Sequence, residues 1–249
     1  MRQRYLLANG RSCYGAHLRI ISLAHVIRLA GAQMRILASA AHKGGVGKTT
    51  LAAHLAVEAE RVGAGPVVLL DTDIQKSLAD WHKARVDDSP TLLSPTLKTL
   101  PNIIAELRTR GMALAIVDTP PGSRVAISAA LAVADMILIP AQPSPIDIRA
   151  VGTTVDMVED AGKPLIFVIN RATPRTRLAA QAAVALSQHG KIAPVTVHQR
   201  VEYAEAMTDG RTAGELHPDG MGQKEISELW TYIDAQMRKR ASAPVRASA

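Results

Sequence analysis

The amino-acid sequence predicts an α/β domain in which a mostly parallel, twisted sheet carries helices on both faces. From Arg35 onward, short apolar runs alternate with longer stretches that have helical spacing, which is typical of successive βαβ crossovers. Apolar residues make up 47% of the 249-residue chain but aromatic residues only 3%, so aliphatic side chains must form the core, as in helices packed on a parallel sheet. The length suits one large domain, and no internal repeat indicates a second.

Each expected element has a local signal in the sequence. Strands are predicted where β-branched residues and leucine cluster, and helices where apolar residues recur every three or four positions. Pro101 begins one helix, while Gly63, Gly111 and Gly162 end three others. In chain order, the predicted strands are 35–41, 66–71, 112–118, 135–141, 163–170 and 193–197. The predicted helices are 49–63, 76–85, 101–111, 124–134, 145–162, 175–190, 201–207 and 224–240.

The two ends of the chain differ in composition from the middle. Residues 1–33 contain five arginines and no acid, so the remainder carries only about +2 of the formal net charge of +7. An Arg-rich, acid-free segment is also typical of an organelle transit peptide. We interpret 1–33 as a basic extension that is disordered or the product of an over-long gene start. Residues 34–240 are the predicted domain, and the small, polar residues 241–249 a flexible tail.

Cysteine content and hydropathy limit the class of protein. Cys13 is the only cysteine in the sequence, which excludes an intramolecular disulfide and a cysteine-rich metal site and fits a reducing compartment. We therefore expect a cytoplasmic protein. No run is long and apolar enough to cross a bilayer, so no integral membrane association is expected.

The stretch "HKGGVGKTT" predicts a phosphate-binding loop, because it follows a strand and opens a helix. Its glycines let several backbone N–H groups point at one anion, and the new helix adds its positive end. Lys48 is expected to reach the β- and γ-phosphates, and the Thr49 hydroxyl to bind Mg²⁺. The strict pattern requires glycine where His42 stands, which leaves a glycine-rich turn as the alternative. The predicted nucleotide-binding residues of this loop are Lys43, Gly44, Gly45, Val46, Gly47, Lys48, Thr49 and Thr50.

Acidic residues end two of the predicted strands. "LLDTDIQ" places Asp71 and Asp73 two positions apart, and "LAIVDTPPG" ends on Asp118, as a Walker-B acid does. A single acid in this position is most often a cap or turn residue. Two such strands that converge on one phosphate loop predict a metal site, with Thr49 and Asp118 holding the magnesium shell.

Together, "KGGVGKTT", "DTDIQ" and "DTPPG" resemble the deviant-Walker ATPases of the ParA/MinD superfamily. "LIPAQPSPIDIRA" and "SLADWHKAR" are similar to the short ParA proteins of plasmid partition, and the resemblance runs from about Met34 to Arg240. It implies a single P-loop NTPase domain that binds ATP and Mg²⁺ and hydrolyses ATP to ADP and phosphate.

The resemblance also implies a role for individual residues. Lys43 is expected to cross a dimer interface and touch the phosphates bound by the opposite subunit, so that ATP closes a homodimer and hydrolysis weakens it. Asp73 is expected to orient the attacking water, which makes Lys43, Lys48 and Asp73 the predicted catalytic residues. Asp71 is expected to lie beside Asp73 near the metal and to join Thr49 and Asp118 as a metal residue. Asn170 matches the position that reads adenine, and the backbone N–H of Gly122 could sense the γ-phosphate. Ile74 replaces the proline usual after the second acid.

The family's dimer binds DNA without sequence preference, so the resemblance implies a nucleoid-associated protein with a ParB-like adaptor, acting in plasmid or chromosome segregation. The candidate DNA-binding residues are Arg171, Arg175, Arg177 and Arg200, with Arg238, Lys239 and Arg240 as further candidates. The alternative for these arginines is a solvated loop. Such binding would act on phosphates alone and depend strongly on salt.

Other functions of the superfamily remain as alternatives. A metabolic ligase of the dethiobiotin synthetase type would use the same phosphate loop with a small-molecule pocket. A MinD-like membrane-associated ATPase would use an amphipathic C-terminal helix, although core packing is the favoured interpretation of that helix. An iron–sulfur reductase is excluded, because it needs paired cysteine ligands.

Overall fold

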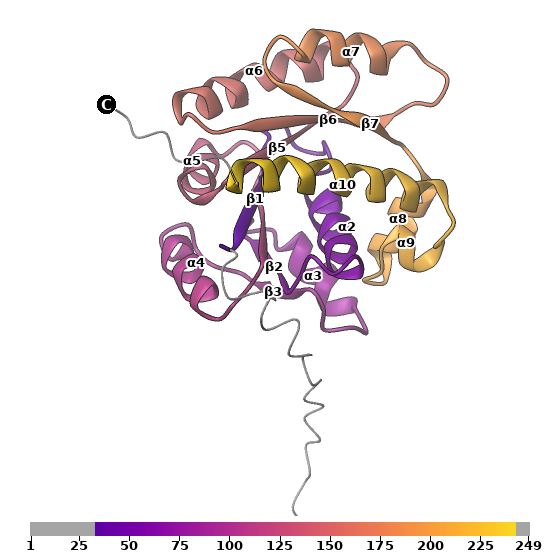
Figure 1. The fold of residues 1–249 in the computed structure, drawn as a ribbon. Coiled ribbons are helices and arrows are strands. Elements are labelled where there is room, and N and C mark those ends of the chain that lie inside the picture. Colours follow the sequence, from indigo (N-terminus) through magenta and orange to yellow (C-terminus); the bar gives the residue numbers. More distant parts are fainter. Residues whose placement is uncertain (1–32, 243–249) are drawn as a thin grey trace, which may run out of the picture. The chain divides into compact units, whose positions relative to one another are not determined.

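A computed structural model describes residues 33–242 and shows one seven-stranded sheet in which every neighbouring pair of strands is parallel. The spatial order is β3-β2-β4-β1-β5-β6-β7 (Figure 1). The strands are β1 (Arg35–Ser39), β2 (Val67–Asp71), β3 (Thr91–Leu93), β4 (Leu114–Asp118), β5 (Met136–Ala141), β6 (Leu165–Ala172) and β7 (Lys191–His198). The predicted fold class is confirmed.

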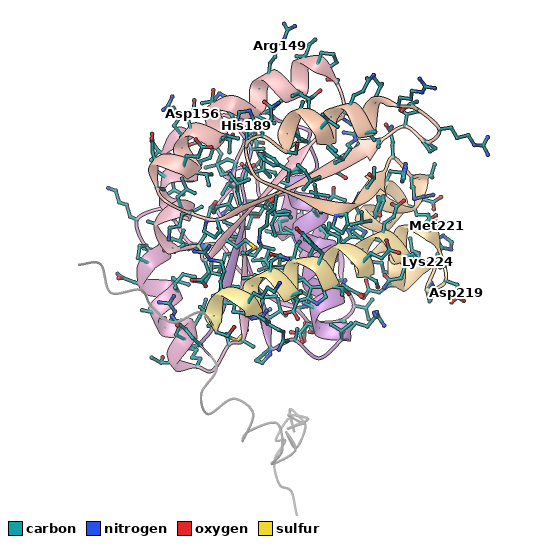
Figure 2. The ribbon with its side chains drawn as sticks, turned by 45° about the horizontal axis from the view of Figure 1, so that its top comes forward. Arg149, Asp156, His189, Asp219, Met221 and Lys224 are labelled. Carbon is teal, nitrogen blue, oxygen red and sulfur yellow. The ribbon has the colours of Figure 1, made fainter. Side chains whose placement is uncertain are left out.

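Helices cover both faces of this sheet (Figure 1). They are α2 (Lys48–Arg61), α3 (Ser77–Ala84), α4 (Leu100–Thr109), α5 (Arg124–Val133), α6 (Pro145–Asp160), α7 (Leu178–Leu186), α8 (Val201–Thr208), α9 (Ala213–Leu216) and α10 (Met221–Ala241). One apolar cluster joins the sheet to α2, α3 and α10, and a second joins its other face to α4, α5, α6 and α7. Successive strand residues alternate between the two clusters, so the strands are apolar throughout. The charged side chains of Arg149, Asp156 and Lys224 are exposed (Figure 2).

Helix α10 packs on the sheet along one stripe. Its side chains Ile226, Leu229, Trp230, Ile233 and Met237 are each at most 3% exposed. Burial of each contributes roughly 1.5–3 kcal/mol relative to exposure, so this stripe belongs to the core, as expected from the sequence. In the described part of the chain, no helix combines the length and the apolar character needed to span a membrane.

Two short elements were not predicted. Strand β3 lies at the sheet edge, and only Leu92 of its three residues is half-buried, so it has no strong apolar signal. Helix α9 is a single turn, held by a capping box between Thr212 and Glu215. Residues 1–32 and 243–249, which include nearly all of the predicted extension and tail, lie outside the described residues.

The topology determines where a ligand can bind. The chain passes from β1 through α2 to β2 on one side, whereas β5, on the other side of β1, is the next strand after β4. Strand β1 is therefore next to the switch point, and open parallel sheets bind ligands at the carboxyl ends of strands there.

Candidate nucleotide-binding site

The loop between β1 and α2 has the backbone of an anion-binding site. Gly45 and Gly47 adopt left-handed conformations, with φ of 73° and 94°, which favour glycine. A Cβ atom on Gly47 would also lie 2.3 Å from the Asn170 amide nitrogen. Lys48 begins α2, whose first turn contains no acidic residue. The free N–H groups of that turn and the helix dipole therefore favour an anion at the loop.

Lys48 supplies a positive charge at this loop. The residue is 6% exposed, and its Nζ donates to the carbonyls of Ala41 at 3.3 Å and Lys43 at 3.4 Å. Burial lowers its pKa, against the opposing fields of Asp118 and Asp73. No carboxylate in residues 33–242 forms an ion pair with this amine. A bound polyphosphate would supply the missing negative charge.

Thr49 and Asp118 fit a magnesium ion. The Thr49 hydroxyl donates to Asp118 Oδ2 at 2.6 Å, and Asp118 is 1% exposed at the end of β4. Burial raises the pKa of Asp118 to about 7. Its second oxygen, Oδ1, is buried without a hydrogen-bond partner in the described structure. A hydroxyl beside a carboxylate oxygen that lacks a partner is a suitable donor set for Mg²⁺ and its waters.

Asp71 is the last residue of β2 and Asp73 lies in the loop that follows, and the two carboxylates differ in environment. Asp71 is fully buried, and its two oxygens accept from the backbone N–H groups of Asp73 at 3.0 Å and Ala79 at 3.1 Å. Asp73 Oδ1 accepts from the N–H of Gln75 at 2.9 Å, and Asp73 lines the cavity beside the phosphate loop. In this conformation Asp71 holds the loop that presents Asp73.

Lys43 points toward α6 of its own chain. Its Nζ lies 2.6 Å from Asp147 Oδ1, and the two side chains are 40% and 6% exposed. Asp147 is in the first turn of α6, where its N–H donates to the Ser144 cap. The lysine thus stands at the rim of the loop, and a carboxylate of the same subunit is its partner.

A cavity of about 610 Å³ extends from the phosphate loop to the segment between β7 and α8. Asn170 Nδ2 donates to the Val46 carbonyl at 2.7 Å, and Arg171 Nη1 donates to the Gly45 carbonyl at 2.9 Å. The N–H of Gly122 donates to the His42 carbonyl at 2.7 Å. Asn170 and Gly122 therefore both brace the phosphate loop here, and in this conformation the Gly122 N–H is engaged.

The four candidate DNA-binding arginines have different surroundings. Arg171 and Arg200 line the cavity, and Arg200 donates to Glu225 through Nη2 at 2.6 Å. Arg175 and Arg177 are exposed and do not line the cavity. Arg171 and Arg200 thus face the nucleotide cavity, whereas Arg175 and Arg177 lie on the surface outside its lining.

Sequence reasoning missed the far wall of the cavity. His198 and Tyr203 line it, and both bond to Glu225 of α10. A signal was present, because Glu225 occupies the position one turn before Leu229 on the buried stripe of α10. An acid at such a core position needs polar partners from elsewhere in the fold.

A parallel sheet whose central strand runs into a glycine loop and a helix N-terminus defines a P-loop nucleotide-binding protein. The chain matches the family model of the CobQ/CobB/MinD/ParA nucleotide binding domain over residues 37–213, and it belongs to this family.

Individual relatives agree with this assignment. The chain is 31% identical over 209 residues to Maintenance of carboxysome distribution protein A of Halothiobacillus neapolitanus, covering 79% of this chain and 95% of that protein. It is 26% identical over 246 residues to the chromosome-partitioning ATPase Soj of Thermus thermophilus, covering 84% of this chain and 98% of that protein. The septum site-determining protein MinD from Pyrococcus horikoshii, solved with Mg-ADP, has a TM-score of 0.69 at 18% identity, covering 84% of this chain and 100% of that chain. The chain is thus an ATPase of the ParA/MinD type, and this prediction is confirmed.

Proposed function

We propose that this ATPase is a DNA-based positioning switch. ATP and Mg²⁺ close two copies face to face, the dimer binds DNA without sequence preference, and an adaptor protein stimulates hydrolysis and release. The observation that carries the proposal is the position of Lys43, a half-exposed amine at the rim of a phosphate loop that already has Lys48. A second cation beside one loop is explained if it serves the nucleotide of a facing subunit.

Exposed apolar side chains around the loop support a face-to-face dimer. Ile74, Val125 and Ile146 are 86%, 71% and 72% exposed. They follow β2, β4 and β5, so they stand at the carboxyl edge of the sheet, where the phosphate loop also lies. Apolar side chains gathered at one edge favour an interaction surface there. We name these three residues the apolar rim.

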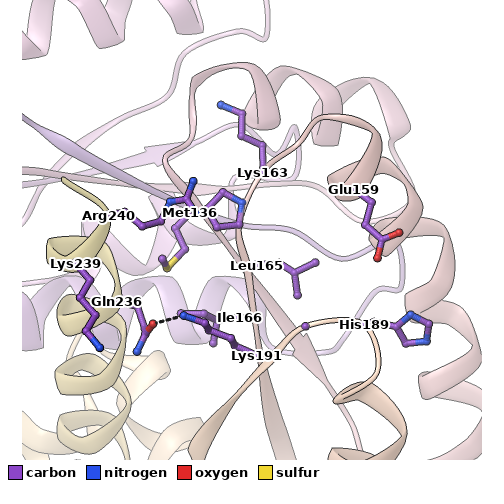
Figure 3. A pocket seen from close by; sticks show the side chains of 12 residues that line it. Met136, Glu159, Lys163, Leu165, Ile166, His189, Lys191, Gln236, Lys239 and Arg240 are labelled. Carbon is purple, nitrogen blue, oxygen red and sulfur yellow. Dashed lines mark hydrogen bonds between the residues drawn. The ribbon is translucent and has the colours of Figure 1, made fainter. Parts of the chain in front are cut away.

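For the proposed DNA contact, two exposed cationic surfaces are available. Arg175 and Arg177 precede α7 and are exposed. At the amino ends of β5, β6 and β7, cations surround a hollow of about 660 Å³; they are Lys163, Lys191, Lys239 and Arg240 (Figure 3). None of these four pairs with an acid within residues 33–242. This edge is opposite the phosphate loop, so it would remain open in the proposed dimer.

A salt titration of duplex DNA binding, with and without ATP, tests the proposal. We expect binding that requires ATP and weakens steeply with salt. R175E/R177E and K239E/R240E compare the two surfaces, with Arg108→Glu, an exposed position on α4, as the control. DNA binding that depends neither on ATP nor on the salt concentration would exclude the proposed switch.

The cargo is proposed from the relatives. The similarity to Soj and to the protein named ParA of Rhizobium radiobacter supports a DNA partition complex with a ParB-like adaptor. The similarity to a carboxysome distribution protein supports a second candidate, a large protein assembly. Co-purification with the tagged ATPase, trapped in its ATP form, separates them: DNA-bound adaptor indicates the first and assembly proteins the second. A membrane-associated ATPase would instead sediment with anionic vesicles, and a ligase would couple ATP turnover to a small molecule.

A further inference from the structure

A buried carboxylate of α10 joins the far wall of the nucleotide cavity to the body of the domain. Glu225 is 5% exposed, and its carboxylate is surrounded by donors from residues 198–203, the segment from the last residue of β7 to the first turn of α8. The contacts to Oε1 are His198 Nδ1 at 2.7 Å, Arg200 Nη2 at 2.6 Å and Arg200 Nε at 3.1 Å, and those to Oε2 are the His198 N–H and the Tyr203 hydroxyl, both at 3.1 Å.

These donors belong to one wall of the cavity. His198, Arg200 and Tyr203 line it together with Lys48 and Thr49 at its other end. The phosphates of a bound nucleotide would occupy the end at Lys48, because the loop amides and the helix dipole are there. The wall from His198 to Tyr203 therefore faces the nucleoside part of the ligand.

The surroundings of Glu225 favour the ionised form. Burial acts to raise its pKa, but the hydrogen bonds from Arg200 and His198 overcome burial and hold the pKa below its ordinary value. A charged acceptor for five donor groups restrains both the backbone and the side chains of the segment. Tyr203 also packs edge-on against His54 of α2, with ring centroids 5.1 Å apart. The segment is therefore restrained from α10 and from the helix that follows the phosphate loop.

We propose that Glu225 is a positioning residue for the nucleoside, which holds the His198–Tyr203 wall in the shape that binds the base and ribose. It acts from α10 without lining the cavity itself. The proposal rests on the ATP site described above, and it assigns to the C-terminal helix a part in nucleotide affinity. Because the wall and the phosphate loop are separate parts of the cavity lining, we expect Glu225 to act equally on ATP and ADP and to leave the hydrolysis step unchanged.

The test compares Glu225→Gln and Glu225→Ala with Glu228→Gln, an exposed residue on the same helix. Fluorescent ATP and ADP analogues give the two dissociation constants, and steady-state phosphate release gives kcat and KM. We expect both dissociation constants and KM to rise about tenfold in Glu225→Ala. Loss of one hydrogen bond to a charged group weakens binding by about this factor. We expect kcat to stay within about twofold of the unsubstituted protein and the preference for ATP over GTP to fall.

A second measurement covers the case in which Glu225→Ala does not fold. Hydrogen exchange of the Glu225→Gln variant should accelerate in residues 198–203 and remain unchanged in β4. Unaltered dissociation constants in a folded variant, a loss confined to kcat, or unaltered exchange of the segment would each overturn the proposal. Lys48→Ala provides the reference for the site: if that variant still bound ATP as tightly as the unsubstituted protein, the phosphate loop assignment would fail, which is a distinct result.

Discussion

The amine of Lys43 is held by Asp147 of the same chain, with 2.6 Å between Nζ and Oδ1. A lysine that bridges two subunits must exchange this partner for the phosphates of the facing nucleotide. The two arrangements compete, so the strength of the Lys43–Asp147 pair opposes dimer closure.

Asp147→Asn should therefore favour the ATP dimer. A pair with one half-exposed partner contributes at most about 1 kcal/mol, and closing the dimer breaks one such pair in each copy. The dimer dissociation constant with a non-hydrolysable ATP analogue should therefore fall up to about thirtyfold. Sedimentation equilibrium measures this constant, and Asp156→Asn, exposed on the same helix, is the control. A weaker dimer would show that Asp147 positions Lys43 for its partner.

Asp73→Ala should stop hydrolysis while ATP binding persists. The side chain lines the cavity, and loss of a residue that orients water typically lowers the rate about 10²–10⁴-fold. Phosphate release measures the rate, and the fraction of protein that stays on DNA after ATP addition should rise. Asp87→Ala, an exposed acid beyond α3, is the control. A normal rate in the Asp73 variant would remove this residue from the mechanism.

Ile74→Asp should weaken the dimer without weakening ATP binding. The side chain belongs to the apolar rim, and its full burial would contribute roughly 1.5–3 kcal/mol. We expect the dimer dissociation constant to rise at least about tenfold. Val184→Asp on α7, 69% exposed in the parent chain and away from the phosphate loop, is the matched control. Equal effects at both positions would argue against the rim as the interface.

Because of His54, the free energy of unfolding should decrease in mild acid. It is buried in α2, with Nδ1 2.8 Å from the Thr50 carbonyl and Nε2 accepting from the Ala213 N–H at 3.0 Å. Burial lowers its pKa to about 4, whereas an unfolded histidine titrates near 6.5. Between these values the unfolded chain binds the extra proton, so stability decreases as pH falls.

Between pH 7 and pH 5, His54 should lower the free energy of unfolding by about 2 kcal/mol. Urea unfolding at the two pH values measures this change. His54→Gln should remove this part of the pH dependence and leave the part due to carboxylates. An identical pH dependence in the variant would contradict the assignment.

The sequence predicts best those features that depend on neighbours along the chain. The loop at Lys48 and the strand ends at Asp71 and Asp118 follow from apolar runs that stop at a glycine or an acid, and the structure places all three at one edge. The partners of Arg171 and Arg200 could not be predicted in this way. Each guanidinium bonds to a group distant in the sequence, Gly45 and Glu225, and only the packed sheet and α10 bring them together.

The most direct test of the central claim is a structure of the Asp73→Ala protein with ATP and Mg²⁺. The proposed function predicts two copies joined at the carboxyl edge of their sheets. In each copy the Lys43 amine should have left Asp147 and should lie within hydrogen-bond distance of the phosphates held by the other copy's Lys48. A nucleotide-loaded protein in which Lys43 still pairs with Asp147, with no facing subunit, would contradict the claim.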